Sequence, residues 1–178
     1  MMVAAENKGV LNILDFGGAL GSTYQQNKIF LDRLTKVNWG IVEQNCFTEI
    51  GRREFSTESL RFFSSIEECY SAFRPGIFLL SSVIHYLEEP YSLLDKIIAV
   101  KPKYILIDRT PFISGKDRIT IQKVHPSIYR ATYPCWFLNR EKFLAYMLDS
   151  YSLVLEFDAL DRANIPSEFK GFLFALKK

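Results

Sequence analysis

The sequence predicts an α/β protein, a doubly wound three-layer sandwich whose seven-stranded, mostly parallel sheet ends in an antiparallel closing strand. Two observations carry this prediction. Five short apolar runs alternate with helical patterns between residues 11 and 108, which is the order typical of a parallel sheet. Two further strand patterns, at 151–157 and 169–176, then follow each other closely, and such spacing favours an antiparallel pair.

Composition narrows the class of protein. The chain has 178 residues, of which 48% are hydrophobic, so we expect a single domain spanning 1–178. The net charge is +2 and the basic residues are scattered, so nucleic acid is not an expected partner. The longest apolar runs are strand-sized, so no membrane insertion is expected. Its three cysteines, Cys46, Cys69 and Cys135, are far apart, which favours a reducing, cytoplasmic location over disulfides or a zinc site. The sequence does not indicate an oligomeric state.

The first strand is expected at Leu11–Asp15, followed by a glycine-rich turn from Gly17 to Gly21. Glycine permits positive φ and lets a ligand lie against the main chain. The next helix is expected over Tyr24–Lys36, with an apolar face formed by Ile29, Phe30, Leu34 and Val37. This layout places backbone N–H groups and a carboxylate where open α/β folds bind nucleotide-like ligands.

The second strand, 37–43, also ends in an acid, Glu43. This residue follows Gly21 by 22 residues. About 20 residues normally separate a glycine turn from a ribose-binding carboxylate. The remaining parallel units are expected as a helix at 45–53, a strand at 60–63, a capping box at 64–67, a strand at 77–81, a turn at 82–89, a helix from Pro90 and a strand at 104–108.

Residues 109–134 break the alternation and read as a loop insert. One period-2 stretch, 119–124, suggests a hairpin or an added strand within it. Long loops at the ligand edge of a sheet are usually functional, so the insert is the expected substrate region. A helix capped by Asn139 should then run to Leu148.

Taken together, the order of elements and the motifs resemble the class I (Rossmann-like) S-adenosylmethionine-dependent methyltransferases. The matching motifs are Asp15-Phe16-Gly17-Gly18-Ala19-Leu20-Gly21, Glu43, and the segment from Ser81 to Pro90. The resemblance covers residues 11–176. Shorter motifs, including 108–112 and 133–134, are similar to predicted methyltransferases of bacterial surface-polysaccharide clusters. The chain departs from the family pattern at Ala19, where the family has a glycine and where a methyl group would crowd the methionine moiety.

The resemblance implies S-adenosylmethionine as the cofactor and assigns residues to it. Asp15 and the glycines would hold the methionine part, Glu43 the ribose hydroxyls, and Phe63 with Ser64 the adenine. The full cofactor set is Asp15, Gly17, Gly18, Gly21, Tyr24, Glu43, Phe63, Ser64, Ser81 and Ser82.

A hydroxyl acceptor needs a base to take its proton. His85 and Asp108 are the candidate catalytic residues, His85 just beyond the fourth strand and Asp108 at the tip of the fifth. The candidate substrate-binding residues are Tyr86, Arg109, Tyr129 and Tyr133. No cluster of histidine and carboxylate has ligand spacing, so no metal is expected.

The predicted function is therefore methyl transfer to a small-molecule acceptor, such as a hydroxyl or amine of a sugar or nucleotide-linked sugar. Two alternatives stay open. One is a non-catalytic Rossmann-like binding module, which Ala19 would favour. The other is an NAD(P)-dependent oxidoreductase, although a short-chain reductase needs a late Tyr-x-x-x-Lys pair and the one match, Tyr24 to Lys28, follows the glycine turn.

Overall fold

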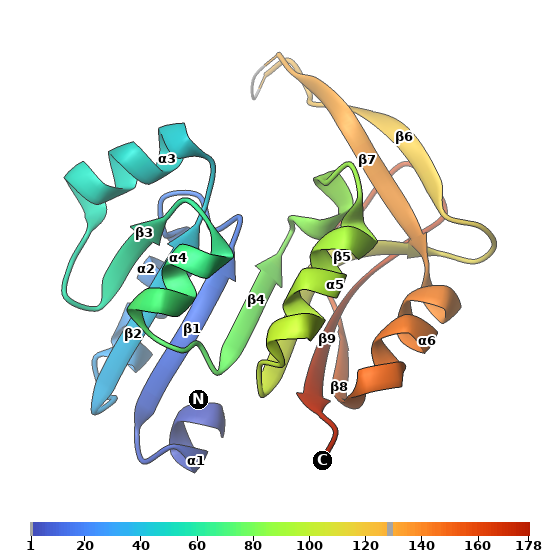
Figure 1. The fold of residues 1–178 in the computed structure, drawn as a ribbon. Coiled ribbons are helices and arrows are strands. Elements are labelled where there is room, and N and C mark those ends of the chain that lie inside the picture. Colours follow the sequence, from blue (N-terminus) through green and yellow to red (C-terminus); the bar gives the residue numbers. More distant parts are fainter. Residues whose placement is uncertain (1, 128–129) are drawn as a thin grey trace. The chain divides into compact units, whose positions relative to one another are not determined.

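The computed structural model describes residues 2–127 and 130–178, which form an α/β fold with a mostly parallel sheet and an antiparallel strand. The chain divides into two compact units, residues 1–81 with 102–104 and residues 82–101 with 105–178 (Figure 1). Each unit contributes its own strands and helices. The described part of the chain contains no helix long and apolar enough to cross a membrane.

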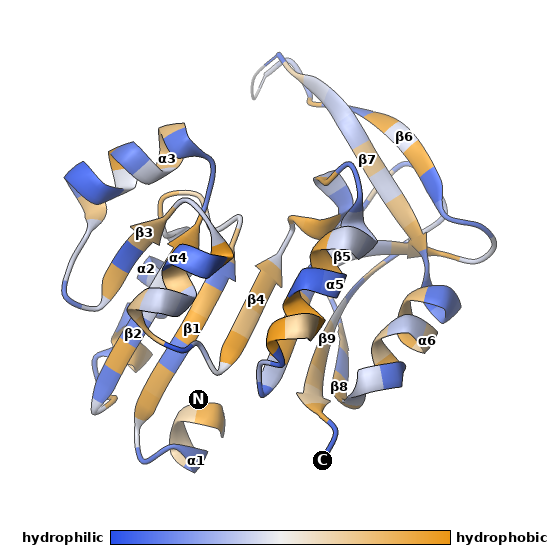
Figure 2. Ribbon diagram, in the orientation of Figure 1, coloured by the Kyte–Doolittle hydropathy of each residue, from blue (hydrophilic) through white to orange (hydrophobic). Residues whose placement is uncertain are grey.

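Unit 1 is built on four parallel strands in the order β3-β2-β1-β4. Their bounds are β1 Val10–Phe16, β2 Lys36–Val42, β3 Leu60–Phe63 and β4 Ile77–Ser81. The strands are apolar along much of their length, as a sheet covered on both faces requires (Figure 2). Leu14, Ile41, Leu60, Phe78 and Leu80 are fully buried and form its core.

The helices of unit 1 are α1 (Met2–Glu6), α2 (Ser22–Leu31), α3 (Asn45–Ile50) with a π-helical turn at Gly51–Phe55, and α4 (Ile66–Ala72). The capping box opens α4 one residue later than predicted, because Ser65 Oγ accepts from the Glu68 N–H. Glu68 reaches back to accept from the Ser64 N–H.

The prediction for α2 was wrong in its extent and in its buried face. The helix ends at Leu31, and Ile29 and Phe30 are 65% and 53% exposed. Only Tyr24 and Leu31 of this helix are buried. The chain turns at Asp32–Thr35, and Val37 already belongs to β2. The apolar residues predicted as one helical face therefore come from the helix, the turn and the next strand.

Unit 2 contains β5 (Tyr104–Ile113), β6 (Arg118–Lys123), β7 (Thr132–Asn139), β8 (Tyr151–Asp158) and β9 (Glu168–Leu176). β9 pairs with β5 and runs antiparallel to β8, which confirms the predicted closing pair. Phe112, Phe143, Phe172 and Phe174 pack as a buried aromatic cluster with ring centroids 5.1 to 6.3 Å apart.

The 109–134 insert is mostly strand rather than loop. β5 continues to Ile113, and β6 forms an antiparallel hairpin with β7, which confirms the hairpin alternative for 119–124. Two strands are thereby added to the seven predicted. Asp108 consequently lies inside β5 and not at its tip. The next residue, Arg109, has a left-handed backbone conformation with a φ of 53°.

The helices of unit 2 are α5 (Pro90–Val100) and α6 (Arg140–Ser150), with one 3₁₀ turn, η2, at Ile84–Tyr86. Pro90 begins α5 as predicted, and its residues Leu93, Leu94 and Ile97 are buried. Asn139 caps α6 by accepting from the Lys142 N–H at 2.6 Å.

Candidate functional site

The glycine turn of unit 1 follows β1 directly and is shaped by Asp15. A Cβ at Gly18 would lie 2.6 Å from both Cγ and Oδ2 of Asp15, so no other residue fits there without a shift. Gly17, Ala19 and Gly21 have φ values of 74°, 49° and 91°. Ala19 therefore occupies the left-handed conformation that favours glycine, at a cost of roughly 1 kcal/mol. The turn therefore packs against the Asp15 carboxyl group, and Gly18 places no side chain over that group.

Asp15 is 1% exposed and accepts one hydrogen bond from a side chain, from Trp39 Nε1 at 3.2 Å. Burial raises the pKa of Asp15 to about 7, the indole bond lowers it and the charge of Glu43 raises it further. No ion pair joins Asp15 to a cation within residues 2–127 and 130–178. A buried acid without a cation is costly to the fold, and such groups cluster at functional sites.

Glu43 joins the second strand to the glycine turn. Its Oε1 accepts from the Ala19 N–H at 3.1 Å and its Oε2 from the Gln44 N–H at 2.8 Å. The Glu43 N–H in turn donates to the Phe63 carbonyl at 3.1 Å, which ties the end of β2 to the end of β3. Each carboxylate oxygen has two acceptor positions, so one on each remains for a diol.

The other predicted cofactor residues of unit 1 differ in exposure. Tyr24 is buried and packs edge-on against Trp39, with centroids 5.7 Å apart. Phe63 is buried beside Phe73, and its carbonyl accepts from Glu43. Ser64 is exposed next to it, and Ser81 ends β4 half-buried. The structure thus brings Asp15, the glycines and Glu43 together, and it places the rings of Tyr24 and Phe63 in buried aromatic contacts.

These residues fit S-adenosylmethionine on chemical grounds. The molecule carries a sulfonium, an ammonium and a ribose diol, and two carboxylates without a cation partner in the described chain lie at the ends of β1 and β2. Glu43 retains acceptor capacity for the diol. The bare Cα of Gly18 would allow a positive group to approach Asp15.

His85 lies in unit 2, on η2, and is 1% exposed. Its Nδ1 is buried and has no hydrogen-bond partner in the described residues. Burial lowers the pKa of His85 to about 4, while the charge of Asp161 raises it and that of Arg109 lowers it. The imidazole is therefore neutral at pH 7 and lines a cavity of about 560 Å³, which we call the unit 2 cavity.

Arg109 is held by a carboxylate that the sequence did not point to. Its Nε donates to Asp161 Oδ2 at 3.0 Å and its Nη2 to Asp161 Oδ1 at 2.8 Å, a bidentate pair. The guanidinium of Arg109 is therefore paired with Asp161 in this structure. Asp108 accepts from the Arg109 N–H through Oδ1, and its carbonyl accepts from the Ser82 N–H at 3.0 Å.

Two of the predicted substrate-binding tyrosines share a glutamine. Tyr86 Oη donates to Gln122 Oε1 at 3.2 Å, and Gln122 Nε2 donates to Tyr133 Oη at 3.4 Å. The two rings meet edge-on with centroids 5.2 Å apart. The third predicted tyrosine, Tyr129, lies outside the described residues.

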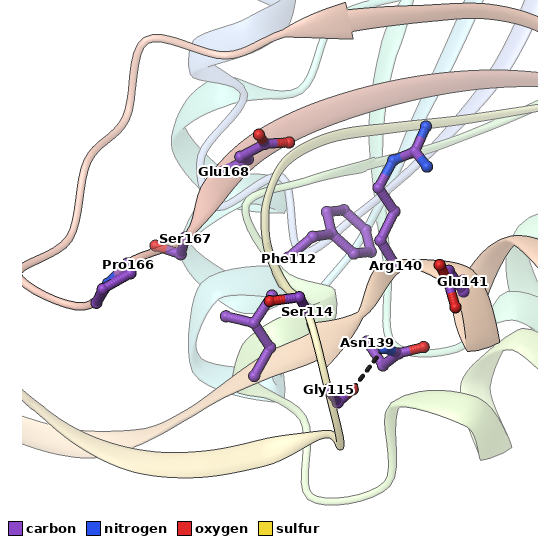
Figure 3. Close-up of a pocket in the computed structure, with 10 residues that line it drawn as sticks. Phe112, Ser114, Gly115, Asn139, Arg140, Glu141, Pro166, Ser167 and Glu168 are labelled. Carbon is purple, nitrogen blue, oxygen red and sulfur yellow. Dashed lines mark hydrogen bonds between the residues drawn. The ribbon is translucent and has the colours of Figure 1, made fainter.

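A second cavity of unit 2, about 410 Å³, opens at the start of α6 (Figure 3). It lies among Phe112, Ser114, Asn139 and Ser167, and Asn139 donates to the Gly115 carbonyl there. None of the predicted site residues lines it. Across the described residues, no group of three or more His, Cys, Asp or Glu could hold a metal ion.

Sequence reasoning missed Trp39 and Asp161. Parallel pairing sets Asp15 opposite Ile41, so Trp39, two residues earlier on β2, shares a face with Asp15. That register was the available signal for the Trp39 bond. Asp161 is 52 residues beyond Arg109 in an irregular segment, where no periodic pattern predicts a partner.

No protein-family model and no curated protein sequence matches the chain. Solved structures do share its fold. The N-terminal domain of EvdMO1, crystallised in the presence of SAH and D-fucose, is 13% identical, with a TM-score of 0.66 over 99% of this chain and 80% of that one. The glycopeptide N-methyltransferase MtfA complexed with S-adenosyl-L-methionine is 10% identical, with a TM-score of 0.62 over 99% and 92%.

A third neighbour belongs to the Pnkp1/Rnl/Hen1 RNA repair complex, at 12% identity and a TM-score of 0.57 over 98% of this chain and 39% of that one. At these identities the likeness concerns the fold alone. The fold is one found in proteins crystallised with SAH or S-adenosylmethionine, and the RNA repair neighbour means that the predicted exclusion of nucleic acid gains no support.

Proposed function

We propose that the protein is an S-adenosylmethionine-dependent methyltransferase acting on a small-molecule acceptor. The observation that carries the proposal is the bond between Glu43 and the Ala19 N–H, beside buried Asp15. It joins the acidic ends of β1 and β2 through the glycine turn, in a fold that solved methyltransferases share.

Each residue of this group has a defined task in the proposal. Glu43 accepts the ribose hydroxyls with the lone pairs left free by the two N–H bonds. Asp15 stabilises positive charge at the turn, because its own charge has no cation partner in the described chain. The backbone of residues 17–21 positions the methionine part. Bound S-adenosylmethionine would supply the electrophilic methyl group.

For a hydroxyl acceptor we propose His85 as the proton acceptor. Its imidazole is neutral above about pH 4, and its Nδ1 has no partner within the described residues. A base with so low a pKa is a weak one, so positioning and desolvation would carry most of the rate enhancement. Asp108 is the second candidate, now placed within β5. The acceptor class we propose is a sugar or nucleotide-linked sugar. We also propose that the protein acts in polysaccharide biosynthesis.

A non-catalytic binding module remains the second candidate, because Ala19 adopts a positive φ in the turn that would hold the methionine part. Calorimetric titration with S-adenosylmethionine, S-adenosylhomocysteine and NADPH tests both. The proposed function requires binding of the two adenosyl compounds, loss of that binding in Glu43→Ala, and methyl transfer to a sugar acceptor. Binding without transfer to any acceptor favours the module, and binding of NADPH alone refutes both.

A further inference from the structure

The unit 2 cavity carries an excess of positive charge that no ion pair in the described chain offsets. Three cations line it, Arg118, Lys123 and Arg162, and no described carboxylate pairs with them. The one acid in its lining, Asp161, is already held by both ends of the Arg109 guanidinium. His85 is neutral at pH 7 and does not change the balance.

The rest of the lining provides hydrogen bonds at a size suited to small molecules. Cavities of roughly 300 to 1,000 Å³ hold such ligands, and this one measures about 560 Å³. Thr120, Gln122 and Asn164 contribute polar side chains, and Tyr86 contributes its ring and hydroxyl. The Nδ1 of His85 is buried and has no hydrogen-bond partner in the described residues, so a ligand could form a hydrogen bond with it.

The cations are not equivalent along the cavity. Arg118 and Lys123 are the first and last residues of β6, which places their Cα atoms about 17 Å apart at roughly 3.4 Å per residue. Side chains alternate along a strand, so Arg118 shares a face of β6 with Thr120 and Gln122, whereas Lys123 lies on the other face. Arg162 comes from the segment between β8 and β9.

We propose that the unit 2 cavity binds an anionic small molecule whose phosphate or carboxylate contacts the unpaired cations of its lining, Arg118, Lys123 and Arg162. Its neutral part would contact Tyr86, Gln122 and His85. Calling this molecule the methyl acceptor rests on the proposed function, whereas the anion site itself does not. The proposed substrate class is therefore narrowed to acceptors that carry a negative charge, such as a sugar phosphate or a sugar acid.

The test measures binding of three probes with a common ring: glucose 1-phosphate, glucuronate and glucose. Isothermal titration or ligand-detected NMR should show binding of at least one anionic probe, weaker binding at raised salt, and no comparable binding of glucose. Lys123→Gln and Arg162→Gln should each weaken that binding by about fivefold, a common effect of losing one charge contact at a partly exposed site. Binding of glucose 1-phosphate alone identifies a phosphate site, and binding of both anions an unselective one.

One variant serves as a matched control. Lys96→Gln removes an exposed cation of α5 outside the cavity. It should leave binding of these probes within about twofold of wild type. Equal binding of all three sugars, no binding of either anion, or an equal loss in Lys96→Gln would overturn the inference.

The two proposals fail separately. Retained S-adenosylmethionine binding without anion binding overturns this site and leaves the proposed function standing. Anion binding that responds to Lys123 and Arg162 in a protein that ignores S-adenosylmethionine supports the site and refutes the methyltransferase assignment.

Discussion

Replacing Asp15 by asparagine tests whether the buried acid lowers stability at neutral pH. Asparagine has nearly the same shape, and its oxygen can still accept from Trp39 Nε1. The pKa of Asp15 is raised from 3.8 to about 7, and about three units correspond to about 4 kcal/mol. Because the folded state holds its proton more tightly, wild type loses stability as the pH rises from 3.8 through 7.

The gain from Asp15→Asn should therefore grow with pH. About 1.5 kcal/mol is expected at pH 5 and about 4 kcal/mol at pH 8.5, before a constant cost for the unpaired amide of asparagine. Urea denaturation of both proteins at the two pH values measures the difference, about 2.5 kcal/mol, in which the constant cost cancels. A difference that does not change with pH would show that Asp15 has an ordinary pKa and would remove the physical basis of the site. S-adenosylmethionine should bind the variant more weakly.

Three further changes test other parts of the molecule. Glu43→Ala should lower S-adenosylmethionine affinity about tenfold or more while the fold survives, and unchanged affinity in calorimetry would exclude Glu43 from the site. Gly18→Ala should destabilise the protein by about 1–3 kcal/mol in urea, because its Cβ would meet the Asp15 carboxyl. In wild type, the lowered pKa of His85 should reduce the free energy of unfolding by up to about 3 kcal/mol as the pH falls from 6.5 to 4. His85→Gln should abolish this loss. An unaltered acid profile in that variant would contradict the burial of His85.

The parallel half of the fold could be predicted because its signals are local. An apolar strand, a glycine turn and a following helix recur within short windows, and β3, β4 and the start of α5 lie where they were expected. The hairpin of β6 and β7 was harder, because the alternation over 119–124 is short and its apolar members Ile119 and Ile121 are exposed. The failure at α2 has a different cause, since Ile29 and Phe30 are apolar but exposed.

The site divides in the same way. Glu43 and the glycines were identified from spacing, and the bond from Ala19 to Glu43 brings them together as expected. What spacing could not supply was burial, which changes the chemistry of Asp15 and His85, and the long-range pair of Arg109 with Asp161. These depend on packing between segments far apart in the chain. The assignment of every predicted site residue to cofactor, substrate or catalysis stays a prediction.

The indole of Trp39 is an intrinsic fluorescent probe of the glycine turn, because it bonds to Asp15. The chain has two tryptophans, and the other, Trp136, donates its Nε1 proton to the Leu87 carbonyl within unit 2. Trp136→Phe would leave Trp39 as the single tryptophan, bonded through its Nε1 to the Asp15 carboxyl group. Its emission would then report, without any label, both the titration of Asp15 and the arrival of a positively charged ligand above it.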